Sequence, residues 1–182
     1  KVVCPATPED AKGLLVTAIE DPNPVLYFEH KHLYRRIKGD VPEERYTVPF
    51  GQARVHREGD DAVVVTWGAM VHTATEAADQ LAGEGAEVEV LDLRTLIPWD
   101  KQKVLESVRR TSKVLVLHED TRTGGFGGQI AATIDEEAFE DLDPPVMRVA
   151  PPDTPVPFSP PLEKAFIPQT EDVLTALRDL AA

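Results

Sequence analysis

The chain has 182 residues, enough for one or two domains. Its 19 basic and 32 acidic residues give a net charge of −13. This charge repels nucleic acid phosphates and favours a basic protein as the partner. No apolar run approaches the ~18 residues that span a bilayer, and no signal peptide is visible, so no membrane partner is expected. The single cysteine, Cys4, cannot form an internal disulfide, which predicts a reducing compartment and a cytoplasmic protein.

The first elements of the chain are predicted as a strand, a helix and a second strand. Residues 1–4 form the first strand, and Thr7 with Pro8 marks the helix start, since threonine caps free amides and proline suits the first turn. The apolar residues at the spacing of one helical face are Ala11, Leu14, Leu15, Ala18 and Ile19. Residues 25–28 add a parallel strand. Because a lone βαβ unit leaves strand edges and faces uncovered, we expect residues 1–34 to be the tail of a larger domain.

A polar connector follows at residues 30–50. We interpret its early basic cluster as a solvated crossing between domains. The cluster consists of Lys31, Arg35, Arg36 and Lys38. After the connector, residues 53–56 and 62–67 predict a β-hairpin that turns near Gly59.

Helices and strands alternate from there onward. Helices are expected at 71–81, 101–110, 126–138 and 170–180, and strands at 88–91, 114–117 and 146–149. Asp100 is positioned to cap the second of these helices. The alternation predicts an α/β fold with a mainly parallel sheet. The proline-rich residues 144–168 carry interspersed apolar side chains, so we expect an ordered, extended wrap over a neighbouring surface.

A glycine-rich turn at residues 124–128 is the segment whose sequence most suggests a functional motif. It follows an unbroken apolar strand, and His118 begins a charged run where that strand is expected to leave the core. The turn matches no known phosphate loop, because no lysine follows its last glycine and Ile130 takes the place of the third dinucleotide-binding glycine. We interpret it as a strand-to-helix turn packed closely against another backbone. The alternative is direct contact with a ligand such as a small anion.

The same turn is predicted to be a self-association surface. Glycines let two backbones approach closely, and an aromatic side chain can supply an apolar anchor. The predicted interface residues are Gly124, Gly125, Phe126 and Gly127. The five histidines are scattered and no serine nucleophile elbow or paired cysteines are present, so the residues themselves predict no catalytic group.

The C-terminal end of the first helix is a candidate site for a monovalent cation. The last four carbonyls of a helix lack intrahelical partners, and the helix dipole concentrates negative potential there. Pro22 and Pro24 have no N–H groups to offer, so oxygen atoms outnumber nearby donors. A flexible ring of carbonyls suits a large ion such as potassium. The alternative is a water-filled helix end at which Asp21 and Asn23 only shape the turn.

Five blocks, in order along the chain, resemble one enzyme family. They read PATPEDAKGLLVTAIEDPNP, VLYFEHKHLYR, LDLRTLIPWD, HEDTRTGGFGGQIAATI and PPDTPVPF. They resemble the β subunit of the thiamine-diphosphate-dependent, decarboxylating first component of 2-oxoacid dehydrogenase complexes, over essentially the whole chain. EHKHLYRR and HEDTRTGG look closest to the branched-chain type, and pyruvate- and acetoin-specific relatives are the alternatives.

The resemblance implies a domain division and a set of partners. Residues 1–34 resemble the end of a pyrimidine-binding thiamine-diphosphate domain, 35–48 a linker, and 49–182 a transketolase C-terminal-like domain. The family forms an α2β2 heterotetramer with thiamine diphosphate and magnesium at its α/β interfaces. The implied partners are therefore an α subunit, a second β subunit, and the subunit-binding domain of the dihydrolipoyl acyltransferase, docked on the acidic C-terminal domain.

The resemblance also assigns site residues. The family's cofactor-activating glutamate and active-site histidine are expected upstream of Lys1, so this chain alone is expected to be inactive and to serve scaffold, assembly and docking roles. The family binds potassium through main-chain oxygens at positions matching Ala18, Ile19, Asp21 and Asn23.

Overall fold

The computed structural model describes residues 1–181 and contains two β-sheets. The larger sheet has the strand order β3-β5-β4-β7-β8. Its strands are β3 (Arg54–Arg57), β4 (Ala62–Thr66), β5 (Val88–Asp92), β7 (Val114–Leu117) and β8 (Met147–Val149). All neighbours pair in parallel except β3, which runs antiparallel to β5 at one edge. The prediction of an α/β fold with a mainly parallel sheet is confirmed.

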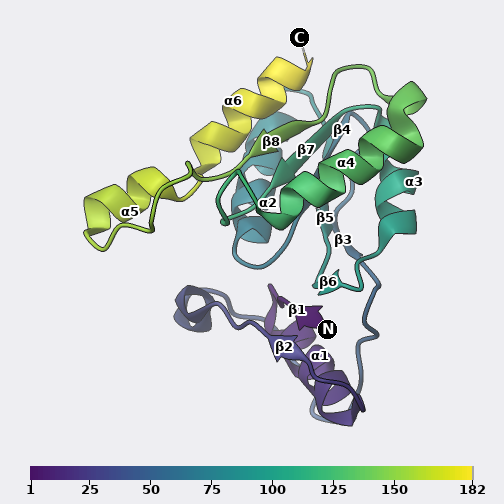
Figure 1. Ribbon diagram of the computed structural model, residues 1–182, viewed down its shortest axis with the longest axis vertical. Coiled ribbons are helices and arrows are strands. Elements are labelled where there is room, and N and C mark those ends of the chain that lie inside the picture. The colour runs from purple at the N-terminus through teal and green to yellow at the C-terminus, as the bar shows by residue number, and fades with distance from the viewer. Residues whose placement is uncertain (182) are drawn as a thin grey trace.

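Helices cover both faces of this sheet (Figure 1). One face packs on α2 (Met70–Ala82) and α6 (Thr170–Ala181), and the other on α3 (Lys101–Thr111) and α4 (Phe126–Ala138), which the short 3₁₀ helix η2 (Phe139–Asp141) extends. Successive side chains of a strand point to opposite faces, and both faces of the central strands are buried, so those strands read as unbroken apolar runs. No helix within residues 1–181 is long and apolar enough to cross a bilayer.

The smaller sheet joins the N-terminal segment to the rest of the chain. Strands β1 (Val2–Val3) and β2 (Leu26–Tyr27) pair in parallel around α1 (Pro8–Glu20), as predicted. The other edge of β1, however, pairs antiparallel with β6 (Thr95–Ile97). The expectation that both strands of the βαβ unit have free edges is therefore wrong for β1, because the chain after β5 returns to cover it.

The N-terminal helix is only partly buried by this chain. The Thr7 hydroxyl accepts a hydrogen bond from the Asp10 N–H at 3.2 Å, so the predicted cap is confirmed. Of the predicted apolar face, Leu14 is fully buried, whereas Leu15 is 43% and Ile19 77% exposed. The periodicity identified the helix, but this chain supplies a covering layer for only half of its apolar face.

The predicted hairpin between β3 and β4 is wrong. Strand β5 lies between them, and each pairs with β5 rather than with the other. The turn at Gly59 instead packs on the start of β5: a Cβ there would lie 2.3 Å from the Val88 carbonyl carbon. Two strands joined by a short turn can still be next-nearest neighbours, and a local sequence pattern does not distinguish the two cases.

The proline-rich segment projects from the domain instead of wrapping over this chain. Within it, α5 (Pro160–Phe166) extends to one side of the molecule (Figure 1). Phe158 is fully exposed and Leu162 is 60% exposed. The expected wrap is not made over this chain, and a wrap over another neighbouring surface stays a prediction.

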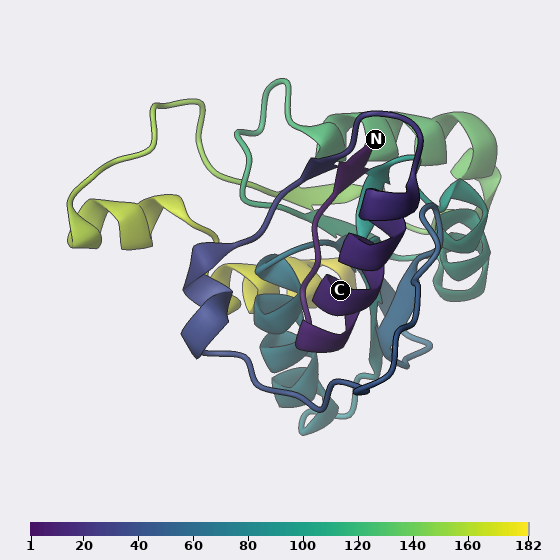
Figure 2. The same ribbon diagram turned by 90° about the horizontal axis from the view of Figure 1, so that it is seen from below.

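The N-terminal segment lies across the carboxyl ends of the parallel strands. Seen from below, α1 lies in front of the larger sheet, and the short 3₁₀ helix η1 (Lys31–Arg35) lies to its left, beside α2 (Figure 2). Residues 36–53 then pass around this end of the molecule without regular secondary structure. In α/β proteins this end of the sheet is where functional groups gather.

Candidate functional site

Three buried polar side chains lie at the carboxyl ends of neighbouring strands. Thr66 ends β4, Asp92 ends β5 and His118 directly follows β7, and each has 0% exposed surface. Thr66 Oγ1, Asp92 Oδ2 and both ring nitrogens of His118 have no hydrogen-bond partner among the described residues. The chain leads from β4 to β5 on one side and onward to β7 on the other, so the winding of the sheet reverses beside β4. This edge is the candidate functional site.

Asp92 is the most strongly perturbed carboxyl group at this edge. Its Oδ1 accepts a hydrogen bond from the Arg94 N–H at 2.9 Å. Burial raises the pKa of Asp92 from 3.8 to about 7, with a further contribution from the negative charge of Asp10. Arg94 itself has a φ of 57°, an uncommon conformation for a residue with a side chain, which the turn from β5 into β6 requires.

A buried ion network joins the N-terminal segment to this edge. Asp10 on α1 is 1% exposed and accepts hydrogen bonds from Arg94 Nη1 at 2.9 Å and Arg54 Nη1 at 3.2 Å. On the backbone, the Cys4 N–H donates to the Arg94 carbonyl at 2.8 Å. Because Asp10 is matched by two guanidinium groups, the carboxylate can be buried without remaining uncompensated.

His118 does not leave the core, contrary to the expectation from its charged neighbours. Its ring stacks on Trp67, with ring centroids 5.5 Å apart and an interplanar angle of 5°. Phe126 packs edge-on against the same Trp67 at 6.2 Å. Burial lowers the pKa of His118, so the neutral ring acts as part of an aromatic stack.

The glycine-rich turn closes over the His118 ring. A Cβ on Gly127 would lie 2.4 Å from the ring nitrogen Nε2 of His118, and one on Gly125 would lie 2.8 Å from its Cε1. The close approach predicted for this turn therefore occurs within the chain, against the His118 side chain at both glycines and, at Gly125, also against the main-chain oxygen of Thr121. Gly124 is exposed and has a φ of 78°, a conformation that favours glycine.

The predicted interface residues thus divide into two groups. Gly125 and Gly127 are buried, Phe126 is half-buried beside Trp67, and only Gly124 is fully exposed. The close-packing reason given for Gly125 and Gly127 is satisfied inside the chain. Self-association through this turn stays a prediction that rests on Gly124 and the exposed part of Phe126.

A shallow hollow of about 560 Å³ lies on the outer side of the same turn. Arg122 and Arg148 contribute to its wall, which gives the small-anion alternative a source of positive charge. Each guanidinium, however, donates to the main-chain carbonyl of the other arginine, at 3.0 and 3.1 Å. The two side chains are therefore engaged in holding the turn against β8.

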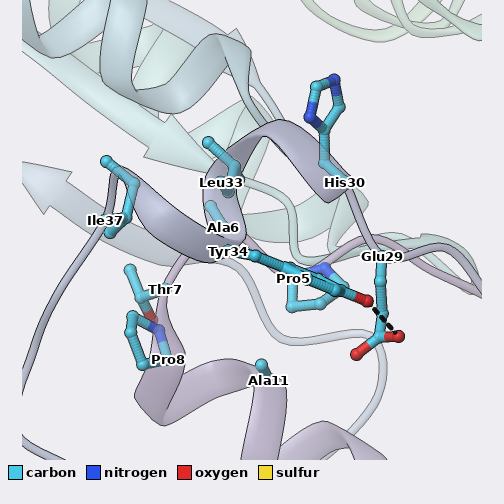
Figure 3. Close-up of a pocket in the computed structure, with 10 residues that line it drawn as sticks. All are labelled: Pro5, Ala6, Thr7, Pro8, Ala11, Glu29, His30, Leu33, Tyr34 and Ile37. Carbon is cyan, nitrogen blue, oxygen red and sulfur yellow. Dashed lines mark hydrogen bonds between the residues drawn. The ribbon is translucent and has the colours of Figure 1, made fainter.

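An apolar hollow of about 410 Å³ lies between the start of α1 and η1 (Figure 3). Its apolar lining residues include Pro5, Ala6, Pro8, Leu33 and Ile37. At its rim, the Tyr34 hydroxyl donates to the Glu29 carboxylate at 2.7 Å, drawn as the dashed line in Figure 3. The polar side chains of the lining are engaged elsewhere: Thr7 caps α1, Tyr34 contacts Glu29, and His30 contacts Glu119. The hollow therefore suits an apolar group.

A sequence-family model for the transketolase C-terminal domain matches residues 51–173. The matched range contains every strand of the larger sheet and most of the chain. This chain belongs to the transketolase C-terminal domain family. The family resemblance identified from the five sequence blocks is confirmed, and the candidate site is the carboxyl edge of a transketolase C-terminal domain.

Among the relatives of this chain are three β subunits of dehydrogenases or oxidoreductases. The chain is 48% identical to 2-oxoisovalerate dehydrogenase subunit beta of Bacillus subtilis, covering 100% of this chain and 56% of the relative. It is 48% identical to acetoin:2,6-dichlorophenolindophenol oxidoreductase subunit beta of Cupriavidus necator, covering 98% of this chain and 52% of the relative. It is 46% identical to pyruvate dehydrogenase E1 component subunit beta of Bacillus subtilis, covering 98% of this chain and 54% of the relative.

One solved structure shares this architecture at nearly full coverage. A split gene transketolase, solved as an inactive beta4 tetramer, superposes with a TM-score of 0.79 at 28% identity, covering 99% of this chain and 56% of that one. The chain therefore spans about half the length of the relatives it matches.

The described residues offer neither a cluster of metal-ligating side chains nor an open diphosphate-binding turn. Within residues 1–181, no group of three or more His, Cys, Asp or Glu side chains could hold a metal ion. The glycine-rich turn of the transketolase C-terminal domain is closed against His118 instead of open to a diphosphate. The residues present thus do not fit thiamine diphosphate or magnesium, and we assign them no catalytic step.

The predicted cation residues lie at the end of α1, outside the matched domain. Asp21 caps the helix, and its carboxylate accepts hydrogen bonds from Lys1 Nζ and from the Asn23 N–H. The Lys1 contact is the main cause that lowers the pKa of Asp21 to about 2. With this carboxylate engaged, the main-chain oxygens of Ala18, Ile19, Asp21 and Asn23 are the ligands that the site can offer. Cation binding there stays a prediction.

Four buried polar groups lie at this edge: sequence reasoning missed Asp10, Thr66 and Asp92, and it noted His118 but expected it to leave the core. A signal was nevertheless present, because three of them directly end or follow apolar strands: AVVVT, VEVLD and VLVLH. A polar residue at the end of a fully buried strand belongs to the carboxyl edge. In this chain the same edge carries the joint to the preceding segment.

Proposed function

We propose that this chain is part of the β subunit of a 2-oxoacid dehydrogenase, with a branched-chain 2-oxoacid as the substrate of the assembled enzyme. The support is an identity of 46–48% to β subunits of 2-oxoisovalerate dehydrogenase, acetoin oxidoreductase and pyruvate dehydrogenase, maintained over at least 98% of the chain. The reaction is oxidative decarboxylation with acyl transfer to a lipoyl group. Pyruvate and acetoin are the second candidates, because their relatives match this chain to a similar degree.

In this proposal the described residues serve assembly rather than chemistry. Thiamine diphosphate and magnesium belong to the assembled α2β2 enzyme, at interfaces with an α subunit. The buried network at Asp10 and the paired strands β1 and β6 hold the N-terminal segment in a fixed position on the domain. A fixed joint of this kind keeps a cofactor-binding surface on one part aligned with docking surfaces on the other.

The same proposal gives the acidic end of α4 a docking role toward the subunit-binding domain of a dihydrolipoyl acyltransferase. Glu140 and Asp143 are exposed, and Oδ2 of Asp141 lies 3.3 Å from Nε of Arg109. Phe139 beside them is 67% exposed. An exposed aromatic residue within an acidic rim suits a basic protein surface that also offers an apolar contact.

The isolated 182-residue chain is expected to show no 2-oxoacid-dependent activity, because it holds no cofactor site. The natural protein, tagged at its C-terminus and purified from its source with bound subunits, is expected to reduce 2,6-dichlorophenolindophenol when thiamine diphosphate, magnesium and 3-methyl-2-oxobutanoate are supplied. Rates with pyruvate and acetoin in parallel assign the substrate. Turnover by the isolated chain, or no turnover by the purified assembly with any of the three substrates, would contradict the proposal.

Potassium is expected to stabilise the β subunit through the end of α1. A ligand that binds only the folded state raises the melting temperature once its concentration passes its dissociation constant. Thermal melts in potassium chloride and in tetramethylammonium chloride at equal ionic strength measure this, since the larger ion does not fit a ring of carbonyls. Identical melting curves of the intact β subunit in the two salts would remove the site.

A further inference from the structure

One stretch of this acidic protein is strongly basic. Residues 30–38, which we name the basic strap, read HKHLYRRIK and contain no acidic residue. The strap comprises η1 and the residues after it, and it passes around the carboxyl end of the sheet (Figure 2). Its cations are Lys31, Arg35, Arg36 and Lys38, all exposed. A patch of this sign stands out against a chain with a net charge of −13.

The charges of the basic strap are not neutralised by this chain. Within residues 1–181, none of its four cationic groups takes part in a side-chain hydrogen bond or a salt bridge. Its one ionic contact is made by His30, whose Nε2 lies 3.2 Å from Glu119 Oε2. Elsewhere most arginines are paired: Arg54, Arg57, Arg94 and Arg110 each contact carboxylates. The four strap cations are therefore left without an ion-pair partner among the described residues, although the chain as a whole is acidic.

A groove of about 740 Å³ runs between the basic strap, the N-terminal turn of α2 and α5. Leu33 and Ile37 of the strap and Met70 of α2 supply apolar lining, while Arg36 and Lys164 contribute positive charge.

Two of the carboxylates at this groove are already engaged. The Glu119 carboxylate accepts from His30, and the Glu76 carboxylate accepts from the Thr170 hydroxyl at 2.9 Å. A third lining carboxylate, Glu163, forms no side-chain hydrogen bond or salt bridge within residues 1–181, so the groove itself carries charge of both signs. The uncompensated positive charge is that of the basic strap along one side of this apolar-lined groove.

We propose that the basic strap and this groove bind an acidic, extended segment of a partner protein. Carboxylates of that segment pair with the strap cations, and its aliphatic side chains enter the groove beside Leu33 and Met70. Cations spread over nine residues suit a chain of charges better than one small anion. A nucleic acid would bring phosphates against the overall negative field of the protein, whereas a short acidic segment can stay beside the strap. The proposal rests on charge and shape and is independent of the enzyme activity proposed above.

Fluorescence anisotropy of labelled model peptides tests this docking site on the complete chain. The probes are three peptides of equal length, composed of Glu and Leu, of Glu and Ser, and of Gln and Leu. The Glu–Leu peptide is expected to bind most tightly, because it alone supplies both carboxylates and aliphatic groups. A variant with Lys31→Gln, Arg35→Gln, Arg36→Gln and Lys38→Gln is expected to weaken its binding about tenfold or more, as the loss of several exposed ion pairs implies.

A matched variant controls for net charge. Lys101→Gln, Lys103→Gln, Arg109→Gln and Lys113→Gln remove the same number of charges from α3 and the start of β7, and they are expected to leave binding within about twofold of the original. Circular dichroism melts verify that both variants fold. Leu33→Ser is expected to reduce the preference for Glu–Leu over Glu–Ser.

Three results would overturn the proposal. Equal weakening in the two charge variants would assign binding to overall charge. An oligodeoxythymidine that binds as tightly as the Glu–Leu peptide would make the strap a phosphate-polymer site. A sedimentation coefficient that falls only in the strap variant would make a second copy of this chain the occupant.

Discussion

Replacing Asp92 by Asn is expected to stabilise the protein at pH 8 and to leave its stability at pH 4 nearly unchanged. The pKa of Asp92 is about 7 in the folded chain against 3.8 when solvated. A carboxyl group whose pKa is raised by folding contributes its full stability below about pH 4 and loses it as pH rises toward 7. With 1.36 kcal/mol per pKa unit, the ionised group costs on the order of 4 kcal/mol of folding free energy at pH 8. Asparagine keeps the oxygen that accepts from Arg94 and carries no charge.

Urea denaturation of both proteins between pH 4 and pH 8 measures this difference. Other groups also change stability with pH: the pKa of His118 is lowered by burial, so its contribution is lost as pH falls below 6.5. Subtracting the two curves cancels such terms and isolates Asp92. Asp143→Asn, the same chemical change at an exposed position, is expected to have no effect. Parallel curves for Asp92→Asn and the original protein would show that the carboxylate is not buried as described.

Gly127→Val is expected to lower the free energy of unfolding by about 3 kcal/mol, the upper end of the usual cost of overpacking a core. A Cβ at this position would lie 2.4 Å from the His118 ring, which is itself held between Trp67 and the turn. The neighbouring Gly128→Val is the matched control, because a Cβ there meets only Nη1 of Arg148 at 3.3 Å, at the far end of a long side chain that can shift by a few tenths of an ångström. Both residues lie in the first turn of α4, so helix propensity affects them equally.

Chemical denaturation of the two valine variants gives the comparison, and a double variant locates its cause. If the loss comes from the ring, combining Gly127→Val with His118→Ala is expected to be less destabilising than the sum of the single changes. A Gly127→Val protein as stable as Gly128→Val would refute the close packing. Changes in assembly caused by Gly127→Val would have to be interpreted through this loss of stability.

The elements of the fold could be predicted from sequence because their signals are local. Thr7 and Asp100 cap helices where the residue pattern indicated, and both faces of β7 are buried as its apolar run predicted. The neighbour of β3 could not be predicted, since pairing with β5 depends on which strand takes the centre of the sheet.

The candidate site was harder to predict for the same reason. The buried joint brings Asp10 to Arg94 across 84 positions of sequence, and no spacing rule connects them. The glycines were noticed for the close approach that they allow, but the side chain that they approach, His118, was not identified, because its burial contradicts its charged surroundings. The polarity of a residue and its neighbours indicates how often such a residue is exposed to solvent. The order of the strands decides whether it is exposed in this fold.

The pairing of β1 with β6 has a consequence for the order in which the chain folds. Residues 2 and 3 find their antiparallel partners only at residues 95–97. Contacts so distant in sequence form late, because a long loop must close before they contribute. During synthesis the βαβ segment therefore leaves the ribosome before β5 and β6 and completes its sheet only after they have followed. Until then its apolar strands and helix are exposed to the chaperones of the cell.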